Sequence, residues 1–188
     1  MIYEENDYYH MYNRGCNKEL IFTERSDYEN LIQKITKSNF KKYLNIISFC
    51  LMPNHYHFLL QQKTEKPISD WISFIFNGYV QYFNRKHSRS GTLFESRVKS
   101  RLITDNSYLI RSSLYIHHNP VAVGLVSKPE DWEFSNYRDW IGSRNSELYD
   151  YKFIRENFDS NEDYKKMMND YIENKISIND MDDFLIDD

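Results

Sequence analysis

The sequence predicts an α+β domain in which an antiparallel, ferredoxin-like or RRM-like sheet carries helices packed on one face. Segments with strand and helix patterning follow the order β-α-β-β-α-β, and a further helix comes after them. The 188 residues are 40% hydrophobic and 28% charged and include only 5 Gly and 4 Pro. That composition is typical of a globular domain with a sizeable core and excludes linker-like and low-complexity chains.

Four segments are expected to form the sheet. Residues 8–14, 44–52 and 55–62 are rich in aromatic and aliphatic side chains, and residues 94–104 are expected to be extended as well. A Pro-Asn turn at residues 53–54 separates the middle two segments, which predicts a hairpin.

Three segments are expected to be helical. Residues 26–38 open on Ser26 with a Glu three positions later, which is a capping-box pattern. Residues 68–87 and 106–118 place apolar side chains at helical spacing. We expect the last helix to stop at Pro120, because proline disfavours helical geometry in the preceding residue.

The net charge of −4 divides unevenly along the chain. Residues 1–144 carry 19 basic and 15 acidic side chains, or +4, whereas residues 145–188 carry 5 and 13, or −8. We therefore expect a functional domain at 1–144 and an acidic, helical C-terminal appendage at 145–188 that frays at 182–188. The appendage either serves folding or self-association, or shields a binding groove of the domain.

A basic segment is the expected contact surface for DNA. Six cations and one acid fall within seventeen residues, and aromatic residues lie in and beside this segment, a combination that suits single-stranded or hairpin DNA. Three of the cations are expected to alternate along one strand face. The candidate DNA-binding residues here are Arg85, Lys86, Arg97, Lys99 and Arg101, with the last three on that strand.

Nothing in the sequence predicts export or membrane insertion. The first fifteen residues lack an apolar run behind a basic start, and polar residues interrupt the longest uncharged stretch, between Lys42 and Lys63. With only Cys16 and Cys50, no disulfide framework is indicated. We expect a cytoplasmic protein that makes no membrane contact.

Two short constellations of residues have side chains suited to metal binding or nucleophilic attack. On a strand, His55 and His57 would point to one face and could share a cation. On a helix, Tyr115 and Asn119 would be stacked one turn apart, so a phenol could lie near an amide oxygen able to bind metal. Each constellation also has an ordinary structural explanation, as solvated histidines, a packed tyrosine and a helix cap.

Together these constellations resemble a known family. MPNHYHFLL at 52–60, YIHHNPVAVGLV at 115–126 and YHMYNRG at 9–15 are similar, in the same order, to motifs of the REP-associated tyrosine transposases. These enzymes belong to the single-tyrosine HUH transposases, named for the pattern of His, a hydrophobic residue and His. The likeness spans about residues 8–140.

The resemblance implies a metal-dependent DNA endonuclease and strand transferase. His55, His57 and Asn119 would hold Mg²⁺ or Mn²⁺, and Tyr115 would attack single-stranded or hairpin DNA, such as repeated palindromes, to form a 5′-phosphotyrosine. His118 is a candidate proton relay, since it lies three residues after Tyr115.

Further expectations follow from the same comparison. Arg14, at the end of the first motif, is expected to join the DNA-binding residues. Where the family commonly has Arg after Asn-Pro-Val, this chain has Ala122, so one basic contact is missing.

Two other functions stay open at this point. A ferredoxin-like sheet with exposed aromatics can be a non-catalytic nucleic-acid-binding module, and a metal-dependent phosphodiester hydrolase would use water as its nucleophile. The site could be completed within one chain, or by the helix of a second copy in a homodimer.

Overall fold

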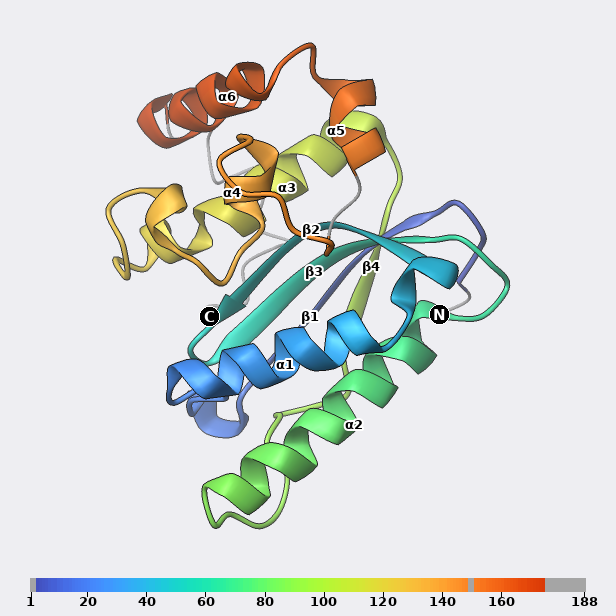
Figure 1. The fold of residues 1–188 in the computed structure, drawn as a ribbon, viewed down its shortest axis with the longest axis vertical. Helices are drawn as coiled ribbons and strands as arrows, with labels where there is room; N and C mark the ends of the chain where they lie inside the picture. The colour runs from blue at the N-terminus through green and yellow to red at the C-terminus, as the bar shows by residue number, and fades with distance from the viewer. Residues whose placement is uncertain (1–2, 149–150, 175–188) are drawn as a thin grey trace.

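The structure is a computed structural model that describes residues 3–148 and 151–174. A four-stranded antiparallel sheet, in the order β2-β3-β1-β4, lies between two layers of helices (Figure 1). The predicted α+β fold with a ferredoxin-like sheet is confirmed. The elements, with the 3-10 turns written η, are β1 (Tyr8–Arg14), η1 (Cys16–Lys18), α1 (Arg25–Lys37), η2 (Phe40–Lys42), β2 (Leu44–Met52), β3 (His55–Gln62), α2 (Ile68–Lys86), β4 (Lys99–Ile103), α3 (Asn106–Ala122), η3 (Pro129–Asp131), α4 (Tyr137–Trp140), α5 (Tyr151–Asn157) and α6 (Asn161–Asn174).

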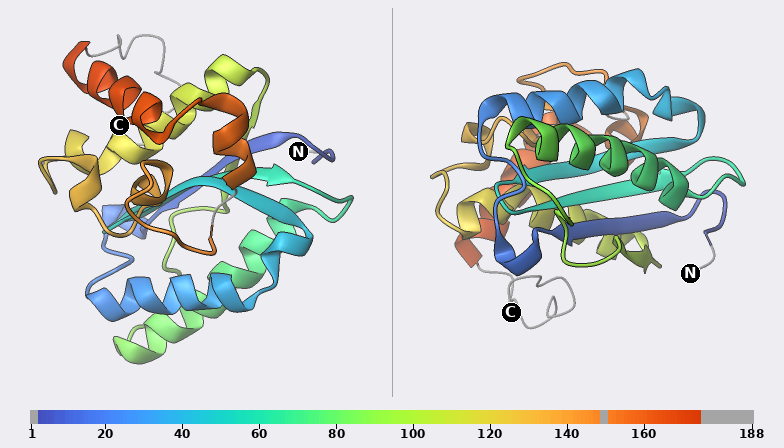
Figure 2. Two further views of the ribbon diagram at one scale, coloured as in Figure 1. Left: turned by 45° about the horizontal axis from the view of Figure 1, so that its top comes forward. Right: turned by 90° about the horizontal axis from the view of Figure 1, so that it is seen from below.

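Alternation along β3 separates the two faces of the sheet. Tyr56 and Phe58 join a buried cluster with α1 and α2, whereas Leu59 joins a second cluster with α3 and the C-terminal helices. Successive side chains of a strand point to opposite faces, so His55 and His57 share the face of Leu59. Figure 2 shows a helical layer on each face. One strand therefore serves an aromatic core on one side and a polar site on the other.

Helices α1 and α2 cover one face, as predicted. Stacked aromatic rings fill this layer: Tyr56 lies on Phe76 with 3.9 Å between ring centroids, and Phe22 lies on Tyr28 at 4.3 Å. Such pairs add to the free energy gained by burying their apolar surface. In residues 3–148 and 151–174, no helix has both the length and the apolar character needed to cross a bilayer.

Helices α3 to α6 form a second layer on the other face, which the sequence did not predict. The expected appendage contributes buried side chains to it, among them Phe153 and Ile154 of α5 and Tyr164 and Met168 of α6. The described part of the acidic appendage therefore takes part in folding. The domain boundary at residue 144 stays a prediction, and the expected fraying at 182–188 lies outside the described residues.

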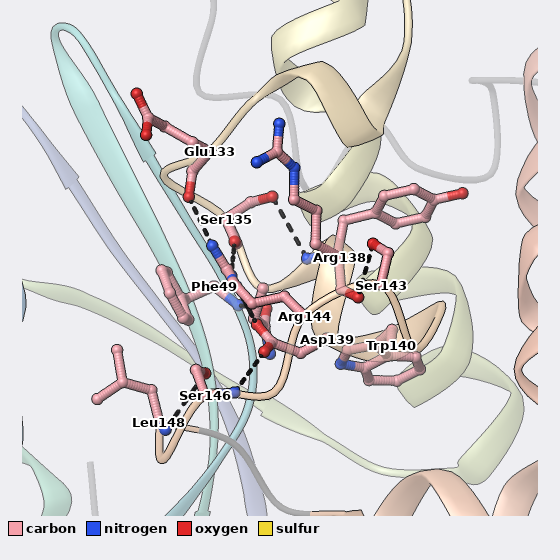
Figure 3. A network of polar contacts seen from close by, with 12 residues as sticks. Phe49, Glu133, Ser135, Arg138, Asp139, Trp140, Ser143, Arg144, Ser146 and Leu148 are labelled. Carbon is pink, nitrogen blue, oxygen red and sulfur yellow. Dashed lines mark hydrogen bonds and ion pairs between the residues drawn. The ribbon is translucent and has the colours of Figure 1, made fainter.

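An ion pair fixes the chain just after α4 (Figure 3). Arg144 pairs with Asp139 of α4 at 2.6 Å and donates to the carbonyl oxygens of Glu133 and Ser135. The second carboxylate oxygen of Asp139 accepts a hydrogen bond from the Ser146 N–H at 2.8 Å. The same segment hydrogen-bonds to the backbone of β2, so it covers that edge of the sheet.

Helix α1 begins one residue earlier than predicted and has a different cap. The expected capping role of Ser26 is wrong: Glu24 is the N-cap, and its N–H donates to the Asp27 carboxylate at 3.2 Å. Asp27 also accepts from the Thr23 N–H at 2.9 Å and pairs with Lys86 of α2 at 2.9 Å. In this capping box the Glu24 side chain takes the role expected of the serine, and the Asp27 carboxylate takes the reciprocal one.

Strand β4 is shorter than the extended segment predicted at 94–104. Phe94 makes only an isolated bridge to Gly15, and Phe94 and Val98 pack against the cluster under α1 and α2. The chain between them leaves the sheet, because both apolar side chains turn toward that core. Regular pairing with β1 starts at Lys99.

Helix α3 runs through Pro120 to Ala122, so the stop predicted at this proline is wrong. A proline inside a helix removes one hydrogen bond and costs about 3 kcal/mol. Pro120 and Asn119 are buried, and the packing of α3 on the sheet offsets this cost. The Leu125 N–H donates to the Pro120 carbonyl at 2.9 Å, and Gly124 ends the helix with a φ of +73°.

The buried carboxylate of Asp27 leads to a pH-dependent prediction. Burial raises its pKa, but hydrogen bonds from Lys86, Thr23 and His87 outweigh burial and hold the pKa well below its usual range. The folded state therefore binds this proton more weakly than the unfolded state. The resulting stabilisation is present above the unfolded pKa of about 4 and is lost as the pH falls below it.

Asp27→Asn should lower the free energy of unfolding by about 2 kcal/mol at pH 7, and by less at pH 3. Urea unfolding at both pH values measures this, with Asp131→Asn as a matched control at an exposed carboxylate. An equal loss at both pH values would contradict the ionised network.

Candidate active site

His55 and His57 lie side by side on the face of β3 that α3 covers. Their ring centroids are 5.0 Å apart, with the ring planes at 88°, and the residues are 3% and 0% exposed. Tyr56, between them, points to the opposite face and packs on Phe76 of α2. Strand alternation therefore brings the predicted pair together.

Asn119 of α3 lies between the two histidines. Its Oδ1 is 3.2 Å from Nε2 of His55, and its Nδ2 is 3.3 Å from Nε2 of His57. Both rings thus present the same nitrogen to one side chain. Because α3 packs across β2 and β3, it delivers this amide to histidines that are distant in the sequence.

Tyr115 lies one helical turn before Asn119, on the same side of α3. Its ring is 5.5 Å from that of His57 and perpendicular to it, at 88°. Tyr115 is 8% exposed, so the phenol is almost covered. The structure places the predicted nucleophile beside a histidine of its own chain.

Each histidine also has a polar contact at its other ring nitrogen. Nδ1 of His55 is 2.7 Å from Oδ1 of Asn54, and Nδ1 of His57 is 2.9 Å from Nε2 of His10. An amide oxygen only accepts hydrogen bonds, and both ring nitrogens of His55 face one, so a neutral His55 donates to only one of the two asparagines at a time. Contacts of this kind orient histidines that bind metals.

Two histidines of this cluster, His57 and His10, are held neutral. Burial, followed by the nearby His55 and His10, lowers the pKa of His57 well below its usual range. Burial and the charge of Arg101 lower the pKa of His10 to about 3. Neutral imidazole is the form that binds a metal ion. Two imidazole nitrogens and one amide oxygen at His55, His57 and Asn119 could therefore hold a divalent cation.

A second group of ligand-type residues lies on the other side of the sheet. One ligand atom from each of Glu24, Asp27 and His87 falls within 4.8 Å of the others. The Lys86 ammonium pairs with Glu24 at 2.7 Å and with Asp27 at 2.9 Å. Because this lysine already neutralises the carboxylates, the cluster is a poorer metal site than the one under α3.

Three of the predicted DNA-binding residues lie on the strand face of the histidines. In the register of the sheet, Arg14 is opposite His55, and Lys99 and Arg101 are opposite alternate residues of β1. Arg14 also pairs with Glu95 at 2.5 Å, and this bond lowers the pKa of the Glu95 carboxyl. These cations border the site on the β1 and β4 side.

The structure does not bring the other predicted DNA-binding residues to this site. Arg85 and Lys86 lie at the end of α2, in the opposite layer. Arg97 is exposed, precedes β4 and lines a groove beside α2. The predicted alternation of Arg97 with Lys99 and Arg101 along one strand is wrong, because the strand begins only at Lys99.

The two histidines next to Asn119 face the C-terminal helices. The ring of His118 packs edge-on against Tyr171 of α6 at 5.3 Å, so the structure does not bring this candidate proton relay to the histidine pair. His117 is fully buried, with Nδ1 2.7 Å from the Tyr164 hydroxyl and Nε2 2.9 Å from Oδ1 of Asn136. These histidines connect α3 to the second helical layer.

The fold and the site agree with a known family. The sequence model of the family described as "Transposase IS200 like" matches residues 4–119, more than half of the chain. The chain belongs to the IS200-like transposase family. The matched segment contains the histidine pair and ends at Asn119, and the resemblance to REP-associated tyrosine transposases is confirmed.

Two relatives of this transposase carry the comparison further. A protein of Haemophilus influenzae, assigned to the REP-associated tyrosine transposases, is 24% identical over 123 residues, which cover 60% of this chain and 70% of the relative. The solved structure of a REP-associated tyrosine transposase bound to a REP hairpin superposes with a TM-score of 0.61 at 16% identity. That match covers 80% of this chain and 92% of the other, and at this identity it shows the fold alone.

Two residues at this site, His10 and Asn54, are not among the site residues that the sequence predicts. His10 carried a usable signal, because it alternates with Tyr12 and Arg14 on the strand face that meets the histidines. For Asn54 the sequence predicts only a place in the turn. Its contact with His55 depends on side-chain geometry that a turn motif does not specify.

The hydrogen bond between Tyr164 and His117 predicts that α6 anchors α3, the helix that carries Tyr115 and Asn119. Tyr164→Phe should lower the free energy of unfolding by about 1–3 kcal/mol, since it leaves a buried imidazole nitrogen without this partner. Chemical denaturation measures the change, with Tyr43→Phe, which is partly exposed, as the matched control. Equal stability of Tyr164→Phe and the wild type would contradict the anchoring role.

Proposed function

We propose that this transposase cuts single-stranded or hairpin DNA with Tyr115 as the nucleophile and rejoins the strand to another end. The observation that carries the proposal is the meeting of Tyr115 and Asn119, from one face of α3, with His55 and His57. A module that only binds nucleic acid needs none of these four residues in that arrangement.

In this proposal His55, His57 and Asn119 hold a divalent cation, Mg²⁺ or Mn²⁺. The donor set fits, because His57 is held neutral and Oδ1 of Asn119 lies 3.2 Å from Nε2 of His55, which brings an amide oxygen and imidazole nitrogens together. Imidazole ligands shift the preference toward Mn²⁺, whereas Mg²⁺ usually keeps several waters. When bound, the ion neutralises charge on an oxygen of the scissile phosphate and orients that group.

The covalent step belongs to Tyr115. The phenol gives up its proton, its oxygen attacks phosphorus, and the bond from phosphorus to the 3′ oxygen breaks. The products are a 5′-phosphotyrosine and a 3′-hydroxyl, which takes up one proton. The ester keeps the energy of the broken phosphodiester, so a second 3′-hydroxyl can reverse the reaction without a nucleotide cofactor. The burial of Tyr115 excludes bulk water that would otherwise hydrolyse this ester.

DNA is the proposed partner of the strand face around the site. Arg14, Lys99 and Arg101 border the histidines, and phosphate contacts by such cations position a strand. The related solved structure is of a transposase bound to a REP hairpin, which supports a hairpin substrate here. The proximity of Tyr115 to His57 of the same chain supports a site that is complete in one copy.

Tyr115→Phe tests the nucleophile. Purified protein is incubated with end-labelled hairpin DNA and Mn²⁺, and covalent adducts are separated on denaturing gels. The adduct should disappear in Tyr115→Phe, because the variant lacks the attacking oxygen. Tyr12→Phe is the matched control, since its ring lies 6.1 Å from His57 and it offers the other nearby phenol.

The outcomes of that experiment separate the three candidate functions. An adduct that survives Tyr115→Phe but is lost in Tyr12→Phe would assign the wrong tyrosine. Cleavage without any adduct, unchanged in both variants, would favour the hydrolase. Binding without cleavage at either metal would favour the non-catalytic module.

His10 provides a test of the metal site that does not depend on turnover. With the Nδ1 proton of His57 bonded to His10, the lone pair of His57 Nε2 stays directed at Asn119. His10→Phe removes that acceptor and should weaken Mn²⁺ binding by about 10- to 100-fold. His10→Gln should recover part of the affinity, because its amide oxygen can accept the same proton.

Electron paramagnetic resonance of free Mn²⁺ measures the affinity in the absence of DNA. Nitrogen NMR of the imidazoles reports whether His57 keeps its proton on Nδ1, a readout that loss of stability alone would not move. Wild-type affinity in His10→Phe would refute the assigned orientation.

A further inference from the structure

A groove lies on the face of the sheet opposite the histidine pair. It is bounded by α2, by the end of β1 and by the loop at residues 94–98. Its lining residues include Tyr56, Phe76, Asn77, Phe94 and Arg97. None of these residues takes part in the proposed covalent step.

The groove holds about 620 Å³, which lies within the range of sites for small molecules. Its floor is the buried side chain of Tyr56, which is 1% exposed. Among the described residues none forms a hydrogen bond with the Tyr56 hydroxyl, and this oxygen is not one of the fully enclosed polar atoms that lack a partner, so it opens into the groove. The floor of the groove thus offers one hydroxyl that a ligand can bond to as donor or acceptor.

The walls of the groove are aromatic. Phe76 lies parallel to the Tyr56 ring at 3.9 Å, and Phe94 meets both rings edge-on, at 5.7 Å from Tyr56 and 5.4 Å from Phe76. Phe94 is only partly buried, so part of its ring is available to a ligand. Flat heteroaromatic rings stack well on such side chains.

The rim is polar and carries little charge. Ser73 and Asn77 are exposed and lie one turn apart on α2. Arg97, which is also exposed, is the one charged residue among the described residues that line the groove. A single cation at the mouth suits one phosphate, while the neutral interior suits an uncharged ring with a hydrogen-bonding edge.

The groove is joined directly to the candidate active site. Tyr56 lies between His55 and His57 in β3, so the floor of the groove and the histidine pair belong to the same three residues. The loop that forms one wall is tied to the site by the ion pair between Glu95 and Arg14. The histidines lie on β3, two strands from the β4 edge, so a DNA strand that passes them crosses two strand spacings of about 5 Å each before it can turn around that edge to the groove.

We propose that this groove binds one unpaired nucleobase of the DNA strand that the transposase cuts. The base would stack against Phe94, its polar edge would bond to the Tyr56 hydroxyl, and its phosphate would meet Arg97. This inference rests on the proposed function, because it takes its ligand from the same DNA. It would give the enzyme a preference for one base beside the cleavage site.

Tyr56→Phe tests the proposal, because it removes the hydroxyl and keeps the ring. The probe is a pool of DNA hairpins with randomised stems and randomised single-stranded flanks. Binding is selected in EDTA with Tyr115→Phe as the parent, so that cleavage does not alter the pool. The parent should show a preference at one unpaired position, and Tyr56→Phe should reduce it by about 3- to 10-fold. Tyr43→Phe, outside the groove, should leave it unchanged.

A second variant fills the groove from its rim. Ser73→Trp should abolish the same preference while leaving hairpin binding in place, and Phe74→Trp on another side of α2 is its control, since Phe74 is 70% exposed. Unfolding curves of each variant show that the fold is kept.

Two results would overturn the inference. If the parent binds hairpins but Tyr56→Phe and Ser73→Trp select the same bases as the parent, the groove does not bind a base, and the proposed function is untouched. If the parent binds no hairpin at all, DNA recognition fails, and the proposed function fails with it.

Discussion

The alternation of side chains along β3 is the constraint on which the molecule depends. This strand lies inside the sheet, so both of its faces are covered, yet the two faces need different chemistry. His55 and His57 point toward α3, and Tyr56 and Phe58 point toward α2. A register shift of one residue would put aromatic rings in the site and imidazoles in the core. The neighbouring strands β1 and β2 fix that register on both sides.

The second requirement is that α3 is held in position, and contacts with the C-terminal helices do much of this. The helix must present Tyr115 and Asn119 to the strand at the same time, across a distance set by side-chain contacts. On its other side His117 is held by Tyr164 of α6 and by Asn136, which also bonds to the backbone of β2. Buried polar bonds of this kind specify one arrangement of the helices more sharply than apolar packing does. The acidic appendage is thereby linked to the site through the fold.

Much of the fold was predictable because local patterns and tertiary structure agree there. β1, β2 and β3 begin and end where their patterning predicts, and the turn at residues 53–54 forms the expected hairpin. The predictions were wrong where a tertiary contact outweighed a local preference. Helix α3 continues through Pro120 because the segment is buried, and α1 is capped by Glu24 and Asp27 because this carboxylate also pairs with α2.

By itself, the sequence determined the sheet, its hairpin, the paired imidazoles and the spacing of Tyr115 and Asn119, since strand and helix periodicities fix which side chains share a face. Only the tertiary structure decided that the two constellations meet within one chain. It also decided that His10 and Asn54 orient the imidazoles, that His118 faces α6, and that Arg97 leaves the strand for a groove behind the site. The reason is physical: such contacts join residues that are far apart in the chain or depend on side-chain orientation, and no local pattern encodes the packing that brings them together.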